Sequence, residues 1–272
     1  MNGLINAMKS IIRKLRFTKS QHDKPYFLSI VAIFKNEAMG MEEWLNHYIM
    51  QGVEHFYLID NGSTDNYKEI FSKFNNITCI INPKKHCQTK HYNKYLSTVK
   101  KYAEWVAVVD LDEFVYARKG FNKIKDFLLT VNDDVGCISL AWKMFGSNGH
   151  IVQPTSIRTG FTRRRVGCSE EINNKEIVRT NKLLKFRIHS HKLRKCEKIK
   201  LPVLNNEESL NKSVLHLNHY VIQSRQFFEN IKMKRGAADN PKYEDIRTWE
   251  YFRNFDHNDI LDEELKNISL KM

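Results

Sequence analysis

The sequence predicts an α/β domain built around a mainly parallel β-sheet. Short apolar runs that suit buried strands alternate four times with segments whose apolar residues recur at helical spacing. Polar residues follow the predicted strands at the ends where parallel sheets bind ligands. The hydrophobic fraction of 42% and the aromatic fraction of 11% are sufficient for a large core, which argues against a disordered chain.

The first two predicted strands are separated by a helix. YFLSIVAIF (26–34) is almost continuously apolar, as expected of a strand buried on both faces. MEEWLNHYIMQG (41–52) has helical spacing and ends in glycine, a common residue just after a helix. VEHFYLID (53–60) is the second strand, and the turn-forming residues NGSTD follow it.

The next two strands repeat this alternation. NYKEIFSKF (66–74) is expected to be a short helix, and NITCIIN, which ends at Asn82, is the third strand. QTKHYNKYLSTVKKYAE (88–104) is predicted as a helix and WVAVVD (105–110) as the fourth strand. The second half is less regular and contains a strand with a glycine-rich loop, CISLAWKMFGSNGH (137–150), and a strand followed by a helix, SVLHLNHYVIQSRQFFENIKMKRG (213–236).

No segment resembles a linker, so a single domain is expected over residues 25–255, with a C-terminal tail at 256–272. Residues 1–24 form a separate basic segment. Its first twenty residues place apolar side chains at helical spacing with lysine and arginine between them. This pattern suits an interfacial helix on an anionic membrane, a helix packed on the domain, or a loose tail, and the sequence leaves these alternatives open.

The net charge of +13 and the isoelectric point near 9.4 favour anionic ligands such as phosphates, nucleic acid or an acidic membrane surface. The five cysteines are scattered and include no CxxC pair, which favours reduced thiols in a cytosolic protein. No apolar run approaches the roughly 18–20 residues that cross a bilayer. The beginning of the chain lacks the features of a signal peptide, so a cytoplasmic location is expected, with peripheral membrane association as an option.

Two carboxylates follow the fourth strand. In extended backbone Asp110 and Asp112 lie on the same side, where their oxygens suit a hard divalent cation. Two protein carboxylates leave coordination positions that phosphate oxygens can fill, as in a metal that activates a diphosphate leaving group. The alternative is a solvated aspartate-rich turn, but the position after a buried strand favours the metal site.

Other strand ends carry polar residues that are expected to converge with these aspartates. Asn36 and Glu37 follow the first strand, and Asp60 and Asn61 follow the second. In DNGSTD (60–65), Asp60 can accept hydrogen bonds from a base N–H or from ribose hydroxyls. The same residues can also form an Asx turn that caps the next helix, and both roles are compatible.

Histidines from the C-terminal half are candidates to complete a metal site. His191 and His219 are the preferred ligands; His189 shares a face with His191 if that segment is a strand, and His216 precedes His219 by three residues. For each histidine a hydrogen-bonded structural role is an equal alternative. A zinc site is not supported, because no cysteine has suitable spacing.

Five segments taken in order resemble the glycosyltransferases of family 92 and their family-2-like bacterial relatives, which adopt the GT-A fold. The segments are SIVAIFKNEA, LIDNGSTDN, WVAVVDLDEFVY, WKMFGSNGH and HLNHYVIQSRQFFENIKMKRG. The resemblance covers about residues 26 to 240. It implies a hexosyltransferase that uses a nucleotide-diphosphate sugar, with UDP the expected nucleotide, and Mn²⁺ or Mg²⁺. Related family 92 enzymes invert the anomeric configuration, and several transfer galactose.

The resemblance also implies roles for residues. Asp60 is expected at the nucleoside with Asn36, Glu37 and Asn61 nearby, Asp110 by the ribose and metal, and Asp112 on the metal. A phosphate clamp is expected from Lys232, Lys234 and Arg235, which lie beside a glycine. The complete set of donor-binding candidates is Asn36, Glu37, Asp60, Asn61, Lys90, Asp110, Lys234 and Arg235.

Inversion requires a general base that deprotonates the acceptor hydroxyl. Glu113 adjoins the aspartates but points away from them unless the chain bends after Asp112. Glu170, Glu171 and Asp239 lie in the half of the chain expected to hold the acceptor. The sequence does not decide among these residues.

The expected acceptor is a glycan or a lipid-linked glycan, as in the synthesis of lipopolysaccharide or another surface polysaccharide. The basic residues between 182 and 194 form either a solvated face or a contact with anionic lipid or a phosphorylated acceptor. A sugar-nucleotide nucleotidyltransferase is the alternative enzyme, although KNEAMG (35–40) is a poor match to its glycine-rich loop. A non-catalytic basic module is the other alternative. Nucleic acid is not expected as a partner, because no RNP, KH or helix-turn-helix pattern is present.

Overall fold

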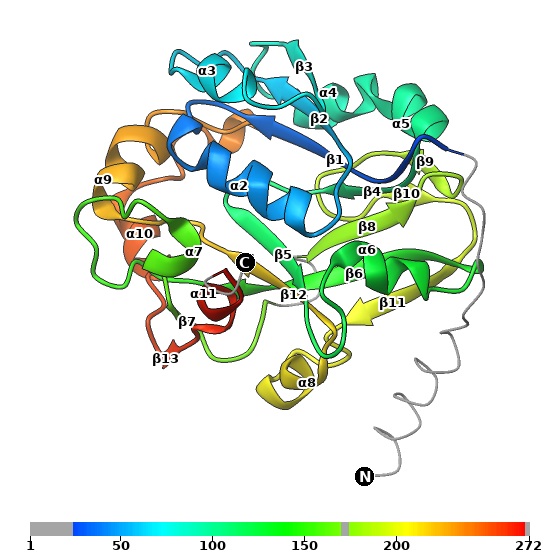
Figure 1. Cartoon of the computed structure of the whole chain (residues 1–272). Coiled ribbons are helices and arrows are strands. Elements are labelled where there is room, and N and C mark those ends of the chain that lie inside the picture. Colours follow the sequence, from blue (N-terminus) through cyan, green and yellow to red (C-terminus); the bar gives the residue numbers. More distant parts are fainter. Residues whose placement is uncertain (1–23, 170–173, 270–272) are drawn as a thin grey trace.

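The computed structural model describes residues 24–169 and 174–269, which form an α/β domain (Figure 1). The parallel half of its sheet contains β1 (Tyr26–Phe34), β2 (His55–Asp60), β3 (Ile77–Ile81) and β4 (Ala103–Val108). The helices between them are α2 (Ala38–Met50), α3 (Tyr67–Phe71), α4 (Gln88–Lys94) and α5 (Leu96–Tyr102). The predicted alternation of strands and helices is confirmed. The helix expected over 88–104 is divided at Tyr95, and β4 begins two residues earlier than predicted.

The order of the strands reverses beside β1. The main sheet runs β3-β2-β1-β4-β8-β6-β12-β5, so β2 lies on one side of β1 and β4 on the other. Such a reversal opens a crevice at the carboxyl ends of the two central strands, where helices leave the sheet in opposite directions. Residues Lys35 to Glu37 follow β1 at this point, and the two aspartates follow β4.

The second half of the chain makes the sheet mixed. β8 (Asn174–Arg179) runs antiparallel to β4 and β6 (Val135–Met144), whereas β12 (Leu215–His219) is parallel to β6 and antiparallel to β5 (Glu113–Ala117). β11 (Glu197–Leu201) pairs with β6. The remaining elements are short: α6 (Ile124–Leu129), α7 (Ile157–Gly160), β7 (Arg163–Arg164), β9 (Leu183–Lys185), β10 (Lys192–Leu193), α8 (Glu207–Lys212), α9 (Arg225–Phe227), η1 (Phe228–Lys232), η2 (Pro241–Tyr243), α10 (Trp249–Phe255), β13 (Ile260–Leu261) and α11 (Glu264–Ser269).

The core has a layer on each face of the sheet. Ile30 and Phe34 of β1 join a cluster that includes side chains of α2, α3 and α6, whereas Val31 and Ile33 join a cluster with side chains of α4 and α5. Alternate residues of one strand therefore bury on opposite faces, as the continuous apolar run predicts. Burial of each large apolar side chain stabilises the folded state by about 1.5–3 kcal/mol. The buried strands therefore hold the positions from which the polar loops leave the sheet.

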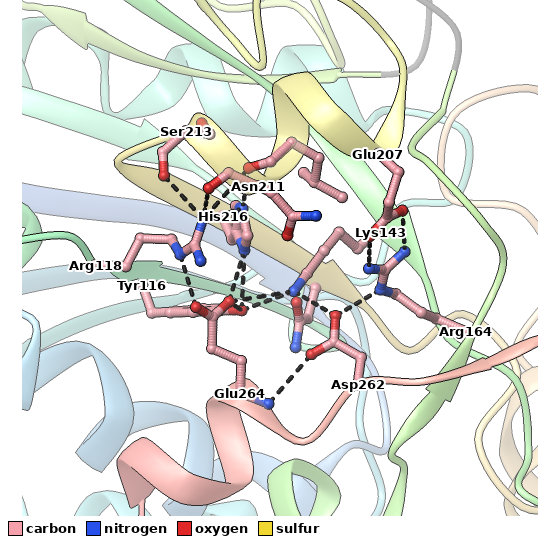
Figure 2. Close-up of polar contacts among 12 residues, drawn as sticks. Tyr116, Arg118, Lys143, Arg164, Glu207, Asn211, Ser213, His216, Asp262 and Glu264 are labelled. Atoms are coloured by element: carbon pink, nitrogen blue, oxygen red, sulfur yellow. Dashed lines mark hydrogen bonds and ion pairs between the residues drawn. The ribbon is translucent and has the colours of Figure 1, made fainter.

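Residues 256–269 are part of the domain, which corrects the predicted C-terminal tail. β13 pairs with β7, and Leu265 of α11 is buried in the main core. Figure 2 shows the polar network behind this attachment: the buried Lys143 of β6 donates hydrogen bonds to Asp262 Oδ2 and to Tyr116 Oη, both at 2.8 Å. Glu264 accepts from Tyr116 Oη at 2.8 Å. The network tolerates a buried ammonium because a carboxylate compensates it.

The basic segment at 1–24 lies outside the described residues apart from Lys24, so its predicted membrane helix stays a prediction. Over residues 24–169 and 174–269, no helix has both the length and the apolar content needed to span a membrane.

Candidate active site

A cavity of about 480 Å³ opens at the carboxyl ends of β1 and β4. Its volume lies in the range of ligand sites, roughly 300–1,000 Å³. The lining combines residues at the ends of the strands with residues between 232 and 255. The polar and aromatic side chains that line it are Phe34, Lys35, Glu37, Asn61, Gln88, Asp110, Asp112, Trp142, His189, His219, Lys232, Arg235, Asp239, Tyr243, Arg247, Tyr251 and Phe255.

Asp110 and Asp112 both line this cavity, as the sequence predicts, but they do so from a turn. β4 ends at Val108, and the Glu113 amide donates to the Asp110 carbonyl at 3.1 Å, which closes a tight turn before β5. The turn is anchored from below, because Trp44 Nε1 donates to the Asp110 carbonyl at 3.0 Å. The bend in the chain therefore brings both carboxylates to the cavity. The prediction that extended backbone places them on the same side is not the reason.

Each aspartate is paired with a buried lysine. Lys175 Nζ lies 2.9 Å from Asp110 Oδ2, and Lys232 Nζ donates to Asp112 Oδ2. Burial alone would raise the pKa of each aspartate, but the lysines outweigh it: Lys175 holds the pKa of Asp110 below its ordinary value, and Lys232 with His219 holds that of Asp112 well below. Both aspartates are therefore carboxylates at neutral pH.

Glu113 is buried beneath the turn and does not line the cavity. Its Oε2 accepts from the Asp110 amide at 2.8 Å and lies 3.4 Å from Lys175 Nζ. Burial raises its pKa to about 7, because the lowering by Lys175 does not compensate for desolvation. The chain does bend after Asp112, but the bend turns Glu113 inward. This position does not suit the predicted role as general base, and Glu113 instead orients Lys175 and the turn.

The histidines are distributed differently from the prediction. His219 lines the cavity, with Nε2 at 3.6 Å from Asp112 Oδ1 and its ring against Trp142. His191 does not line it: its Nδ1 accepts from the Arg187 amide at 3.1 Å and its ring packs on Phe186. Of the His-x-His pair it is His189 that reaches the cavity. The prediction of His191 is therefore wrong, because residues 186–191 are not a regular strand.

Glu37 and Arg235 connect the end of β1 with the segment that follows η1. The Arg235 guanidinium donates to Glu37 Oε1, and both side chains are largely buried. Gly236 follows with a φ of +67°, and a Cβ there would lie 2.5 Å from Glu244 Oε1, so glycine is required at this turn. Of the three residues expected to form a phosphate clamp, Lys232 and Arg235 line the cavity and Lys234 does not. The clamp itself remains a prediction.

Asp60 and Asn36 organise the loop after β2. Asp60 Oδ1 accepts from the Ser63 amide at 2.7 Å and Oδ2 from Tyr67 Oη at 3.0 Å. Asn36 Oδ1 accepts from the Thr64 amide at 2.7 Å. Neither residue is among those that line the cavity, whereas their neighbour Asn61 is. Asp60 therefore orders the DNGSTD loop, but the alternative role as a cap of the next helix is not seen, because the N-cap residue of α3 is Asn66 and it makes no side-chain cap hydrogen bond. Nucleoside contact by Asp60 remains a prediction.

Two of the donor-binding candidates lie outside the cavity lining. Lys90 on α4 and Lys234 are exposed and do not line the cavity; Lys234 Nζ donates to Asn230 Oδ1 at 3.3 Å. Glu171 lies outside the described residues, as does Glu170. Asp239 is partly exposed and lines the cavity, which makes it the one proposed base among the described residues that is placed to meet a substrate.

The side chains present fit a divalent cation in a small site. Within 24–169 and 174–269, no group of three or more His, Cys, Asp and Glu side chains is arranged to hold a metal. Asp112 Oδ1 is nevertheless buried without a hydrogen-bond partner, and His219 Nε2 lies beside it. An orphaned carboxylate oxygen and an imidazole nitrogen are suitable donors for Mn²⁺ or Mg²⁺, with water or donor oxygens in the other positions.

Sequence reasoning missed Lys175, Gln88 and Arg247. Lys175 lies in a strand of otherwise ordinary composition, NKEIVR, and its partner Asp110 is 65 residues away. A lysine inside a strand buried along most of its length is the available signal, because such a charge needs an acidic partner.

The fold and this site define the class of the protein. A sheet whose order reverses beside β1, with paired aspartates at that point, is the GT-A arrangement, so the protein has the GT-A fold. The family follows from sequence. Residues 24–269 match the model of glycosyltransferase family 92, and the chain belongs to this family.

Curated relatives carry the same family name. A glycosyltransferase family 92 protein of Oryza sativa subsp. japonica is 24% identical over 225 residues, which are 79% of this chain and 36% of the relative. One from Arabidopsis thaliana is 25% identical over 248 residues, 86% of this chain and 41% of the relative. The chain thus spans well under half the length of these relatives.

Solved structures with similar elements include a mannosyltransferase from Pyrobaculum calidifontis in complex with GDP-Man and Mn²⁺. It has a TM-score of 0.34 and 17% identity, over 50% of this chain and 43% of that one. Glucosyl-3-phosphoglycerate synthase from Mycobacterium tuberculosis, in complex with Mn²⁺, UDP and glucosyl-3-phosphoglycerate, has a TM-score of 0.35 and 12% identity, over 62% and 66% of the two chains.

Proposed function

We propose that this protein transfers a hexose, with inversion, from a UDP-linked sugar to a glycan or lipid-linked glycan, and that it depends on Mn²⁺ or Mg²⁺. The observation that carries the proposal is the meeting of opposite charges in one cavity: Asp112 and His219 beside Lys232 and Arg235. The Asp112 carboxylate and the His219 imidazole suit a metal, and the cations suit a diphosphate.

The donor diphosphate would lie against the wall formed by Lys232, Arg235 and Arg247. Guanidinium groups bind phosphate oxygens through paired N–H donors, so Arg235 and Arg247 would orient the two phosphates. A bound Mn²⁺ or Mg²⁺, held by Asp112 and His219, would neutralise negative charge on the departing diphosphate. Asn61, the residue of the DNGSTD loop that lines the cavity, suits the nucleoside.

Asp239 is the general base that we propose. It lines the cavity from the same segment as Lys232 and Arg235. As a partly exposed carboxylate it can accept the proton of an acceptor hydroxyl. The aromatic side chains of Tyr243, Tyr251 and Phe255 line the cavity near it and suit the apolar faces of an acceptor sugar.

We also propose that the acceptor or the working surface is anionic and that the protein acts in the cytoplasm, at the inner face of a membrane. The net charge of +13 supports the first point. All five cysteines are free, which supports a reducing compartment.

A panel of sugar nucleotides tests the proposed reaction. With Mn²⁺ present, the wild-type chain should release nucleoside diphosphate from a UDP-sugar, and Asp112→Asn should lower this rate at least a hundredfold. Asp259→Asn is the matched control, because Asp259 is exposed and is not among the residues that line the cavity. Release that is absent for every sugar nucleotide, or equal in the Asp112 variant and the wild type, would contradict the proposal.

A further inference from the structure

Asp112 already has a cation of its own. Lys232 Nζ donates to Asp112 Oδ2, and the two side chains are only 2% and 6% exposed. His219 Nε2 is 3.6 Å from the other oxygen, Oδ1, which has no hydrogen-bond partner. The carboxylate best suited to hold a divalent cation is therefore half occupied by a protein ammonium.

Lys232 is placed by the fold and not by chance rotation of a surface side chain. It ends the π-helical turn η1, in which the Met233 amide donates to the Phe228 carbonyl at 2.9 Å. The preceding turn is capped by Ser224 Oγ, which accepts from the Phe227 amide at 3.1 Å. Single π turns are infrequent and concentrate at functional sites, so the direction of Lys232 is a specific feature.

The surroundings of Lys232 contain few acids. Glu37 is a second carboxylate near it, and Glu37 is already bound by Arg235. Arg235 and Arg247 add two positive charges to the same wall. If a divalent cation took Asp112, the Lys232 ammonium would stay buried beside that ion with no free carboxylate, an arrangement that is strongly unfavourable.

The second aspartate does not have this difficulty. Lys175 contacts two carboxylates, Asp110 at 2.9 Å and Glu113 at 3.4 Å. If Asp110 shared an oxygen with a metal, Glu113 would still compensate Lys175. The conflict between metal and ammonium is therefore specific to Asp112 and Lys232.

We infer that Lys232 is an internal competitor of the metal, which keeps metal affinity low until a diphosphate arrives to take the ammonium. The inference rests on the proposed function, since the donor diphosphate is the anion that releases Lys232 from Asp112. It predicts that metal and nucleotide bind together, and that this coupling depends on one side chain.

Calorimetric titration of the full chain with Mn²⁺ alone tests the inference directly. Lys232→Met should bind Mn²⁺ at least about tenfold more tightly than the wild type, because a buried unit charge beside the ligand has been removed. With Mn²⁺ saturating, the same variant should bind UDP at least about tenfold more weakly, because a phosphate contact is lost. Adding Asp112→Asn to Lys232→Met should abolish the gain in Mn²⁺ affinity.

Lys73→Met is the matched control, since it removes a lysine from an exposed ion pair with Glu42 and should change neither affinity. Lys232→Gln, which keeps polar contact with Asp112 without the charge, repeats the test if the methionine variant does not fold. In the wild type, UDP should tighten Mn²⁺ binding beyond the association of the two in solution.

Equal or weaker Mn²⁺ binding by both Lys232 variants would overturn the inference. So would a wild-type Mn²⁺ affinity that saturating UDP leaves unchanged, whichever variants fold. A chain that shows the Lys232 effect on Mn²⁺ but turns over no sugar nucleotide would contradict the proposed reaction and leave the competition intact.

Discussion

Replacing Lys175 by methionine should destabilise the protein strongly, because one ammonium compensates two carboxylates. Lys175 and Glu113 are 2% and 0% exposed, and Asp110 is 33% exposed. Methionine has a similar length and fills most of the volume, so loss of charge is the main change. Asp110 and Glu113 would then face each other without a cation.

The magnitude follows from burial. Removing one partner of a buried ion pair typically costs about 3–5 kcal/mol. Glu113 softens this cost, since its pKa is already raised to about 7 by burial and it can take up a proton near neutral pH. The partial exposure of Asp110 softens it further. We therefore expect the free energy of unfolding to fall by about 3 kcal/mol at pH 8, near the lower end of this range.

The loss should depend on pH with a defined sign. In the variant, the pKa of Glu113 rises further above its unfolded value, so the folded state binds more protons than the unfolded state through and above neutral pH. The stability contributed by protonated Glu113 is fully present below the ordinary pKa and disappears as pH rises through the folded pKa. The variant should thus be closer to the wild type at pH 5.5 than at pH 8.

Urea unfolding at pH 5.5 and pH 8, followed by tryptophan fluorescence, measures these differences. Lys175→Met combined with Glu113→Gln should recover more than about 1 kcal/mol at pH 8, because one of the stranded carboxylates is removed. Lys73→Met should stay within about 1 kcal/mol of the wild type. A loss below about 1 kcal/mol at pH 8, or a double variant no more stable than the single one, would refute the reasoning.

Three further predictions concern the network around β12 and the loop after β2. Glu264→Gln should lower the free energy of unfolding by about 1.5–3 kcal/mol in urea titration, because Glu264 accepts a hydrogen bond from the charged Arg118 and another from the buried Tyr116. A change within error would show that the network contributes little to stability. Burial lowers the pKa of His216 to about 4, so the contribution of this group to the free energy of unfolding should be constant above pH 6.5 and should fall by up to about 3 kcal/mol toward pH 4. His216→Gln should flatten that slope in urea unfolding, and an unchanged slope would exclude His216 as its source. Tyr67→Phe removes the hydrogen-bond donor to Asp60 Oδ2, so it should lower the free energy of unfolding by about 1–2 kcal/mol and weaken UDP binding in calorimetry, whereas the control Tyr102→Phe should do neither. Normal UDP binding by Tyr67→Phe would show that Asp60 does not contribute to the nucleoside site.

Local patterns were sufficient to predict the parallel half of the fold. The apolar run at 26–34 is buried on both faces, and the alternation with helices leaves few arrangements for such strands. The same logic brings Asp110 and Asp112 to the cavity, since any residue just after a parallel strand reaches that edge. It also brings Glu37 there.

Long-range pairing was beyond the sequence. Lys232 meets Asp112 across 120 residues, and nothing in the local sequence distinguishes it from Lys234, which is exposed. The histidines show a different limit: the choice of His191 assumed strand alternation, whereas residues 186–191 form irregular backbone that turns His189 to the cavity. The C-terminal residues were predicted to form a tail, yet Asp262 is bound by the buried Lys143 and Glu264 by Arg118.

The central claim is that Asp112 holds a metal that helps to bind a nucleotide diphosphate. Calorimetric titration of UDP into the wild-type chain and into Asp112→Asn, each with Mn²⁺ and with EDTA, tests it most directly. We expect the wild type to bind UDP at least about tenfold more tightly with Mn²⁺ than with EDTA, and Asp112→Asn to lose this difference. Equal enhancement by Mn²⁺ in the two proteins, or no binding of UDP to the wild type under either condition, would contradict it.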